Sequence, residues 1–131
     1  MSMNSQARIV IVGGGIMGVA LAYHLAEEGE TNVMLIEKGE LTSGSTWHAA
    51  GQCPSLVSNY NLAKIHDYGN RLYPTLEEKT GQYVSWHASG GIRVARQQAD
   101  IDWFHYMKGI ADNVGFHMEI IDAAKIKELN P

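Results

Sequence analysis

The chain has 131 residues, the length of one ordinary domain, and 45% hydrophobic against 18% charged residues leave enough apolar side chains for a core. Ten basic and fourteen acidic residues give a formal charge of -4 without a run of Lys or Arg, which argues against a nucleic-acid or anionic-membrane partner. The single cysteine, Cys53, excludes an internal disulfide framework and a cysteine-based zinc site. No apolar stretch has the length of a membrane span and no secretory signal pattern begins the chain, so we predict a cytoplasmic protein.

The first segment has the pattern of a strand, a helix and a second strand. A β-branched run, Ile9–Val12, stops at three glycines and is typical of a strand buried on both faces. A helical apolar face follows and ends before Gly29, and a second apolar run, Val33–Ile36, ends at Glu37. These three elements lie within about thirty residues, so they predict a right-handed, parallel βαβ unit.

The rest of the chain alternates loops, helices and short apolar runs. Residues 38–58 are rich in Gly, Ser and Thr without a period, which predicts a functional loop. Helical spacing predicts a helix over residues 59–79, a second around 103–114 and a short last one capped by Asp122. Two further runs, Tyr83–Trp86 and Ile92–Ala95, predict an antiparallel hairpin, and Phe116–Ile121 predicts a strand.

The glycines after the first strand form a dinucleotide-binding fingerprint. Gly13 permits a tight turn, Gly15 lets a pyrophosphate approach the backbone, and Gly18 allows close packing of helix on strand. The helix N-terminus then supplies free N–H groups and a favourable dipole for the phosphates. Glu37 can accept hydrogen bonds from a ribose 2′-hydroxyl and would repel a 2′-phosphate. The predicted contacts of this part are Gly13, Gly14, Gly15, Ile16, Met17, Gly18, Glu37 and Lys38, and they do not separate NAD from FAD.

The segment after the second strand carries a specific resemblance. Residues 37–51 read EKGELTSGSTWHAAG, and this stretch resembles the dimethylglycine and sarcosine dehydrogenase family, within the D-amino-acid-oxidase-like superfamily. The strong match covers residues 9–51, and residues 89–93 are also similar. Residues 51–55, Gly-Gln-Cys-Pro-Ser, depart from the mammalian pattern and look more like bacterial members.

The resemblance implies FAD as the cofactor, with a covalent bond from His48 to the 8α-methyl group of the flavin. Small residues allow the loop to pass close to the cofactor, Ser45 and Thr46 offer hydroxyls to phosphate oxygens, and a neutral imidazole is a competent nucleophile. The predicted loop contacts are Gly44, Ser45, Thr46, His48, Ala49, Ala50 and Gly51. No metal site is predicted, because the other histidines lack paired ligand spacing.

The predicted fold class is α/β, the N-terminal part of an FAD-binding Rossmann-like (βαβ) domain followed by the start of an antiparallel substrate-side layer. We assign residues 1–80, including the flavin loop, to the first part and residues 81–131 to the second. Two parallel strands fall short of the about five or six of a complete doubly wound sheet, so the remainder of the chain or a partner subunit is expected to complete the domain.

The implied activity is FAD-dependent oxidation of an N-methyl C–H bond in a small secondary or tertiary amine, such as dimethylglycine or sarcosine, to an iminium ion. Family members often carry a C-terminal domain that uses tetrahydrofolate, which this chain does not contain. Catalytic residues are not assigned, although Arg93 is a candidate anchor for a substrate carboxylate. A non-catalytic FAD-binding or regulatory relative remains an alternative, as does an NAD-dependent dehydrogenase.

Overall fold

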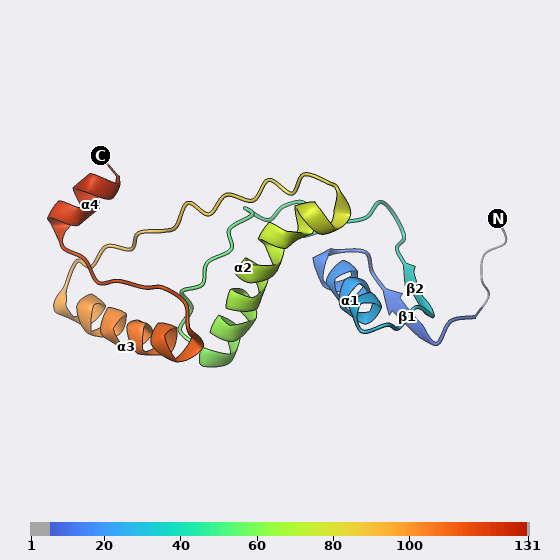
Figure 1. Ribbon diagram of the computed structural model, residues 1–131, viewed down its shortest axis with the longest axis horizontal. Coiled ribbons are helices and arrows are strands. Elements are labelled where there is room, and N and C mark those ends of the chain that lie inside the picture. The colour runs from blue at the N-terminus through green and yellow to red at the C-terminus, as the bar shows by residue number, and fades with distance from the viewer. Residues whose placement is uncertain (1–5, 131) are drawn as a thin grey trace. The chain divides into compact units, whose positions relative to one another are not determined.

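The computed structural model describes residues 6–130, which contain two strands and four helices (Figure 1). In chain order these are β1 (Ile9–Val12), α1 (Ile16–Glu27), β2 (Val33–Ile36), α2 (Tyr60–Thr80), α3 (Gln98–Val114) and α4 (Ala123–Leu129). The chain divides into two compact units, residues 1–52 and 53–131. The domain division after residue 80 stays a prediction. No helix within residues 6–130 is long and apolar enough to cross a membrane.

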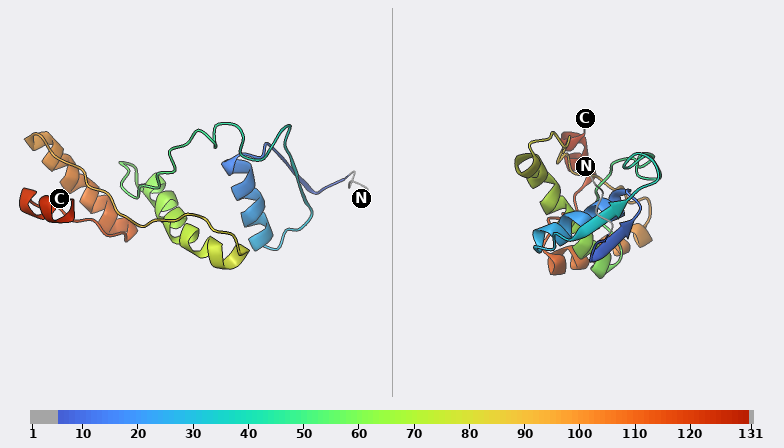
Figure 2. Two further views of the ribbon diagram at one scale, coloured as in Figure 1. Left: turned by 90° about the horizontal axis from the view of Figure 1, so that it is seen from above. Right: turned by 90° about the vertical axis from the view of Figure 1, so that its right-hand side faces the viewer.

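The first unit is the predicted βαβ arrangement, and its parallel strands are confirmed (Figure 2). β1 and β2 pair in parallel with Ile9 opposite Val33, and α1 packs on both strands. The predicted burial of β1 on both faces is wrong: Ile11 is buried, whereas Val10 is 50% and Val12 84% exposed. Within the described part of this unit α1 is the single helix on the sheet, so one face is left uncovered.

The second unit is helical, and its helix ends follow the predicted capping signals. Asn59 Oδ1 accepts hydrogen bonds from the N–H groups of Asn61 and Leu62 at the start of α2, and Gly81 ends α2 in the left-handed region with φ 69°. Gly115 ends α3 with φ 98°, and Asp122 caps α4. The helix prediction is therefore confirmed in type, and the ends of α2 agree within one or two residues. α3 ends where predicted but begins at Gln98, five residues before the predicted start.

A small apolar core holds α2 and α3 together. Its buried members are Ala63 from α2 and Met107 and Ile110 from α3, with Leu56, Val57, Val114, Phe116 and Met118 packed around them. Met107 is fully buried, as expected for a flexible side chain that fills an irregular gap.

The predicted hairpin and the predicted strand over Phe116–Ile121 are wrong. Tyr83–Trp86, Ile92–Ala95 and Phe116–Ile121 all lie in irregular coil, and the segment between α2 and α3 has no strand in Figure 1. Their β-branched and aromatic residues favour strands, but a strand is stable only with a backbone partner. Within residues 82–96 no backbone N–H donates to a backbone carbonyl, so the described structure contains no antiparallel layer.

Candidate functional site

The turn between β1 and α1 has the geometry that its glycine pattern requires. Gly13 has φ 105°, and its N–H donates to the Ile36 carbonyl at 2.8 Å, which fixes the turn at the end of β2. A Cβ atom on Gly18 would lie 1.9 Å from the Gly13 carbonyl oxygen. Both positions therefore need glycine, one for its backbone angle and the other for the close packing of α1 on the turn.

Glu37 connects the end of β2 to this turn. Its Oε2 accepts a hydrogen bond from the Gly14 N–H at 2.7 Å, and its Oε1 accepts one from the Gly39 N–H at 2.9 Å. These two bonds hold the pKa of the Glu37 carboxyl below its ordinary value, and the bond from Gly14 has the larger effect. Each carboxylate oxygen has a further lone pair, so Glu37 can still accept hydrogen bonds from ribose hydroxyl groups. The sequence predicted the ribose contact but not this structural role of the carboxylate.

The loop after β2 folds back onto the same turn through backbone hydrogen bonds. The Thr42 N–H donates to the Gly14 carbonyl at 2.9 Å, and the Trp47 N–H donates to the Thr42 carbonyl at 3.0 Å. Gly14 is buried beneath the loop, where an added Cβ would lie 2.5 Å from Leu41 Cδ2. The small residue at position 14 is thus required by the loop rather than by a ligand.

Thr46 places a hydroxyl at the N-terminus of α1. Its Oγ1 accepts a hydrogen bond from the Ile16 N–H at 2.9 Å, and a Cβ on Gly15 would lie 3.2 Å from that oxygen. In the described part of the chain, the next two N–H groups, of Met17 and Gly18, donate to no acceptor. The helix start therefore presents two free N–H groups beside a hydroxyl that can still donate its own hydrogen.

His48 is exposed in the loop with one ring nitrogen engaged. Its Nδ1 lies 2.9 Å from the Gly44 carbonyl oxygen. A carbonyl oxygen only accepts, so Nδ1 carries the hydrogen in the neutral ring and Nε2 keeps its lone pair. Nε2 is therefore the nitrogen available for bond formation.

The remaining predicted contacts lie around these groups on the surface of the first unit. Ile16, Met17, Lys38, Gly44, Ser45, Ala49, Ala50 and Gly51 are all exposed. The unit thus brings the glycine turn, Glu37, Thr46 and the His48 loop together, while the contact of each residue with a cofactor stays a prediction. No cluster of metal-ligating side chains occurs in residues 6–130.

The arrangement fits a dinucleotide whose second half reaches beyond the phosphates. Free N–H groups and the dipole at the start of α1 suit a pyrophosphate, and the absence of a Cβ at Gly15 leaves room for the Thr46 hydroxyl beside them. The Glu37 carboxylate suits a ribose, and His48 Nε2 offers a nucleophile on the adjoining loop.

Comparison with known proteins identifies the family. The family model of the FAD-dependent oxidoreductases (DAO) matches residues 8–131. The chain belongs to this family. The dimethylglycine dehydrogenase of rat mitochondria is 47% identical to it over 126 residues, which cover 96% of this chain. The 4-methylaminobutanoate oxidase (formaldehyde-forming) of Paenarthrobacter nicotinovorans is 38% identical over 127 residues, 97% of this chain.

A solved structure supports the fold. The L-amino acid deaminase from Proteus vulgaris superposes with a TM-score of 0.81 at 23% sequence identity, over 98% of this chain and 31% of that chain. The resemblance to the dimethylglycine dehydrogenase kind and the α/β fold with parallel strands are thus confirmed. The chain spans 15% of the length of both curated relatives. One of them is mitochondrial, so the cytoplasmic location stays a prediction.

Proposed function

We propose that this chain forms the nucleotide-binding start of an FAD-dependent oxidoreductase acting on the N-methyl group of a small secondary or tertiary amine. The observation that carries the proposal is the loop of residues 41–49, which is hydrogen-bonded onto the glycine turn and presents Thr46 and His48 beside it. FAD, when bound, supplies a flavin that accepts the hydride of the C–H bond and so leaves the amine as an iminium ion.

Different residues of the first unit would bind different parts of the cofactor. The start of α1 would bind the pyrophosphate through the Met17 and Gly18 N–H groups, with the Thr46 hydroxyl as a further donor. Glu37 would accept the ribose hydroxyls while it remains bonded to Gly14 and Gly39. The backbone bonds that lower its pKa favour the ionised carboxylate, and an ionised acceptor forms stronger hydrogen bonds to hydroxyl donors than a neutral one.

His48 would attach the cofactor covalently. The Gly44 carbonyl accepts the Nδ1 hydrogen and leaves the Nε2 lone pair free, so Nε2 could replace one hydrogen of the flavin 8α-methyl group by a C–N bond. The substitution would release two electrons and two protons in all, one proton from the broken methyl C–H bond and one from the imidazolium that forms. Dioxygen would take up both by way of the flavin and leave as hydrogen peroxide. The tautomer set by Gly44 supports this assignment, because an Nε2–H ring would have no lone pair at the exposed nitrogen.

The substrate class is supported by the chemistry that the relatives share. Dimethylglycine and 4-methylaminobutanoate both carry a methylated amine and a carboxylate. We propose a substrate of that kind, such as dimethylglycine or sarcosine, for the protein of which this chain is the start of the cofactor domain. The folate-using domain and the remaining subunit or chain stay predictions.

Acid precipitation of the flavin-loaded protein tests the covalent bond. The yellow colour should stay in the pellet, and the tryptic peptide Gly39–Lys64 should carry the mass of FAD. In His48→Ala the flavin should bind but pass into the supernatant with acid. His105→Ala, an exposed histidine on α3, is the matched control and should retain the bond. Flavin released from the unaltered protein would refute covalent attachment and leave binding intact.

Anaerobic addition of dimethylglycine or sarcosine tests the activity. The flavin absorbance should bleach with a saturable dependence on the amine concentration, and dimethylamine should act more weakly because it lacks the carboxylate. A flavin that stays oxidised with every methylated amine would contradict the proposed oxidation and favour the non-catalytic alternative. A protein that binds NAD but no flavin would favour the alternative of an NAD-dependent dehydrogenase.

A further inference from the structure

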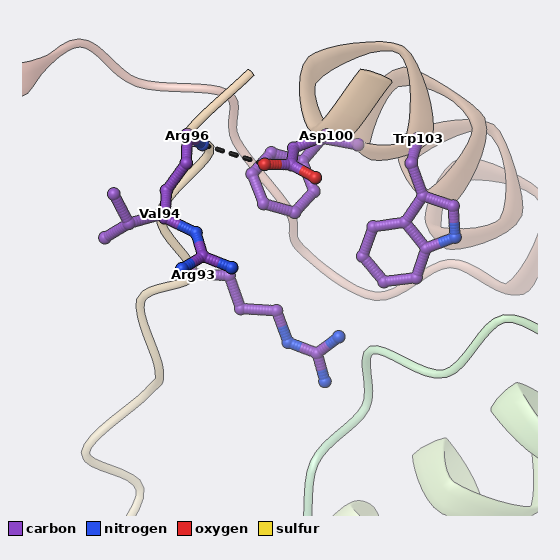
Figure 3. A pocket seen from close by; sticks show the side chains of 6 residues that line it. Arg93, Val94, Arg96, Asp100 and Trp103 are labelled. Atoms are coloured by element: carbon purple, nitrogen blue, oxygen red, sulfur yellow. Dashed lines mark hydrogen bonds between the residues drawn. The ribbon is translucent and has the colours of Figure 1, made fainter. Parts of the chain in front are cut away.

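The second unit contains a polar pocket that the proposed cofactor site does not use. It lies between the coil segment 93–96 and the first two turns of α3, with a volume of about 370 Å³. Arg93, Val94 and Arg96 line it from the coil segment, and Asp100 and Trp103 line it from α3 (Figure 3). Phe104 of α3 completes the lining. Small-molecule sites have volumes of about 300–1,000 Å³, so this pocket suits a ligand of a few heavy atoms.

Arg93 is held in place at this pocket by two contacts. One guanidinium nitrogen, Nη2, donates to the Leu56 carbonyl at 3.0 Å, and the guanidinium carbon lies 5.7 Å from the centre of the Trp103 ring. A guanidinium group has five N–H donors, and the Leu56 carbonyl engages one of its nitrogens. Arg93 therefore combines a fixed position with unused donor capacity.

Arg96 adds a second guanidinium with no ion-pair partner among residues 6–130. Asp100 lies in the same pocket, but its Oδ2 accepts hydrogen bonds from the backbone N–H groups of Arg96 and Gln97 at 2.8 and 3.3 Å. Two guanidinium groups and one carboxylate leave one net positive charge in the pocket. That charge matches a monocarboxylate and is poorly suited to a dianion.

We infer that the Arg93–Arg96 pocket binds the carboxylate group of a small molecule. Arg93 and Arg96 donate to the two carboxylate oxygens, Trp103 keeps Arg93 in position, and Asp100 disfavours ligands of higher negative charge. The carboxylate has two possible sources with the same chemistry: the amine substrate itself or a separate small carboxylate. The binding inference does not depend on the proposed oxidation.

Protection of arginines from phenylglyoxal tests the pocket in the flavin-loaded protein. A monocarboxylate on an open surface is expected to bind with a Kd on the order of 10 mM. About 100 mM acetate, at ionic strength held constant with chloride, should then slow modification of Arg93 and Arg96 by about tenfold. Arg8 and Arg71 already pair with Glu30 and Asp67 and serve as internal controls whose rates should not change. Peptide mass spectrometry reports each site separately and needs no turnover.

Variants make the result specific to the pocket. Arg96→Gln should reduce the protection of Arg93 by acetate, whereas Lys108→Gln, the same charge change in the third turn of α3, should not. Three results would each overturn the inference. Acetate could protect Arg93 equally in Arg96→Gln and in the parent protein, neither acetate nor dimethylglycine could protect the two arginines, or sulfate could protect them more strongly than acetate.

The two sources are separated by kinetics. If the carboxylate belongs to the substrate, dimethylglycine should protect Arg93 and Arg96, and Arg96→Gln should raise its KM several-fold with kcat retained. If a separate carboxylate binds, acetate should protect while the KM for the amine is unchanged by Arg96→Gln. Protection without any flavin reduction would refute the proposed oxidation and leave the pocket intact.

Discussion

Two irregular stretches of this chain differ in how they are held. Residues 38–52 make a succession of backbone hydrogen bonds, from Thr42 to Gly14 and from Trp47 to Thr42, and Thr46 caps the start of α1. Residues 82–97 make no backbone bond among themselves and are anchored mainly by Arg93 and by the Asp100 carboxylate on α3, which accepts from the Arg96 and Gln97 N–H groups. The Gly/Ser-rich stretch is thus the more extensively hydrogen-bonded of the two, because the neighbouring turn and helix start offer partners for its polar groups.

The largest expected effect comes from disturbing the close packing of α1 on the glycine turn, to which the ordered loop is hydrogen-bonded. Gly18→Ala places a Cβ 1.9 Å from a backbone carbonyl, so the turn must move and we expect a loss of about 2–3 kcal/mol of stability together with FAD loading. Gly109→Ala is the control, since its Cβ meets nothing within 4 Å, and it should stabilise α3 by up to about 1 kcal/mol. Denaturant unfolding of both variants measures the difference, and equal stability of Gly18→Ala and the parent would contradict the packing argument.

A smaller effect is expected when the hydroxyl that joins the loop to α1 is removed. Thr46→Val keeps the shape but leaves the Ile16 N–H without its acceptor, which should cost about 1 kcal/mol and weaken FAD binding. Thr46→Ser should retain most of both. Thr75→Val removes a hydroxyl that only donates to a helix carbonyl at the surface of α2 and should change little. Flavin titration and thermal unfolding of the three variants check this, and a Thr46→Val protein indistinguishable from Thr75→Val would refute the capping role.

The smallest effect concerns the pH dependence of the two regions. Because the folded-state pKa of Glu37 is lowered, its contribution to stability is complete above the unfolded value of about 4.5 and is lost as the pH falls through the lower folded-state pKa. Glu37→Gln should therefore flatten the fall of Tm below pH 4.5. The pKa of Asp100, just after the 82–97 stretch, is likewise lowered, by the hydrogen bond from the Arg96 N–H. Asp100→Asn should therefore also flatten the fall of Tm at acid pH. If Tm falls with the same slope below pH 4.5 in the parent and in both variants, the proposed stabilising roles of the Glu37 and Asp100 carboxylates are wrong.

The parts that sequence predicted well depend on near neighbours. The glycine stops of α2 and α3 and the Asp122 cap follow from residues within one turn of each other. The βαβ unit follows from three successive periodic segments together with the rule that such crossovers are parallel and right-handed. The failed hairpin depends on pairing between segments, which local propensity does not determine. The Thr46–Ile16 bond joins residues thirty positions apart, and the Glu37–Gly14 bond joins residues 23 apart. The one available signal for both was the absence of side chains at Gly14 and Gly15, where the loop and its hydroxyl lie.

The Thr46 hydroxyl has a consequence for the order in which the site assembles. A hydroxyl can accept from the Ile16 N–H and donate elsewhere at the same time, so an arriving phosphate adds a hydrogen bond without breaking one. The entropy of ordering the loop is then lost during folding and not during ligand capture. Such preorganisation lets association proceed without a slow closing step, so the encounter rate, and not a loop rearrangement, would limit cofactor loading.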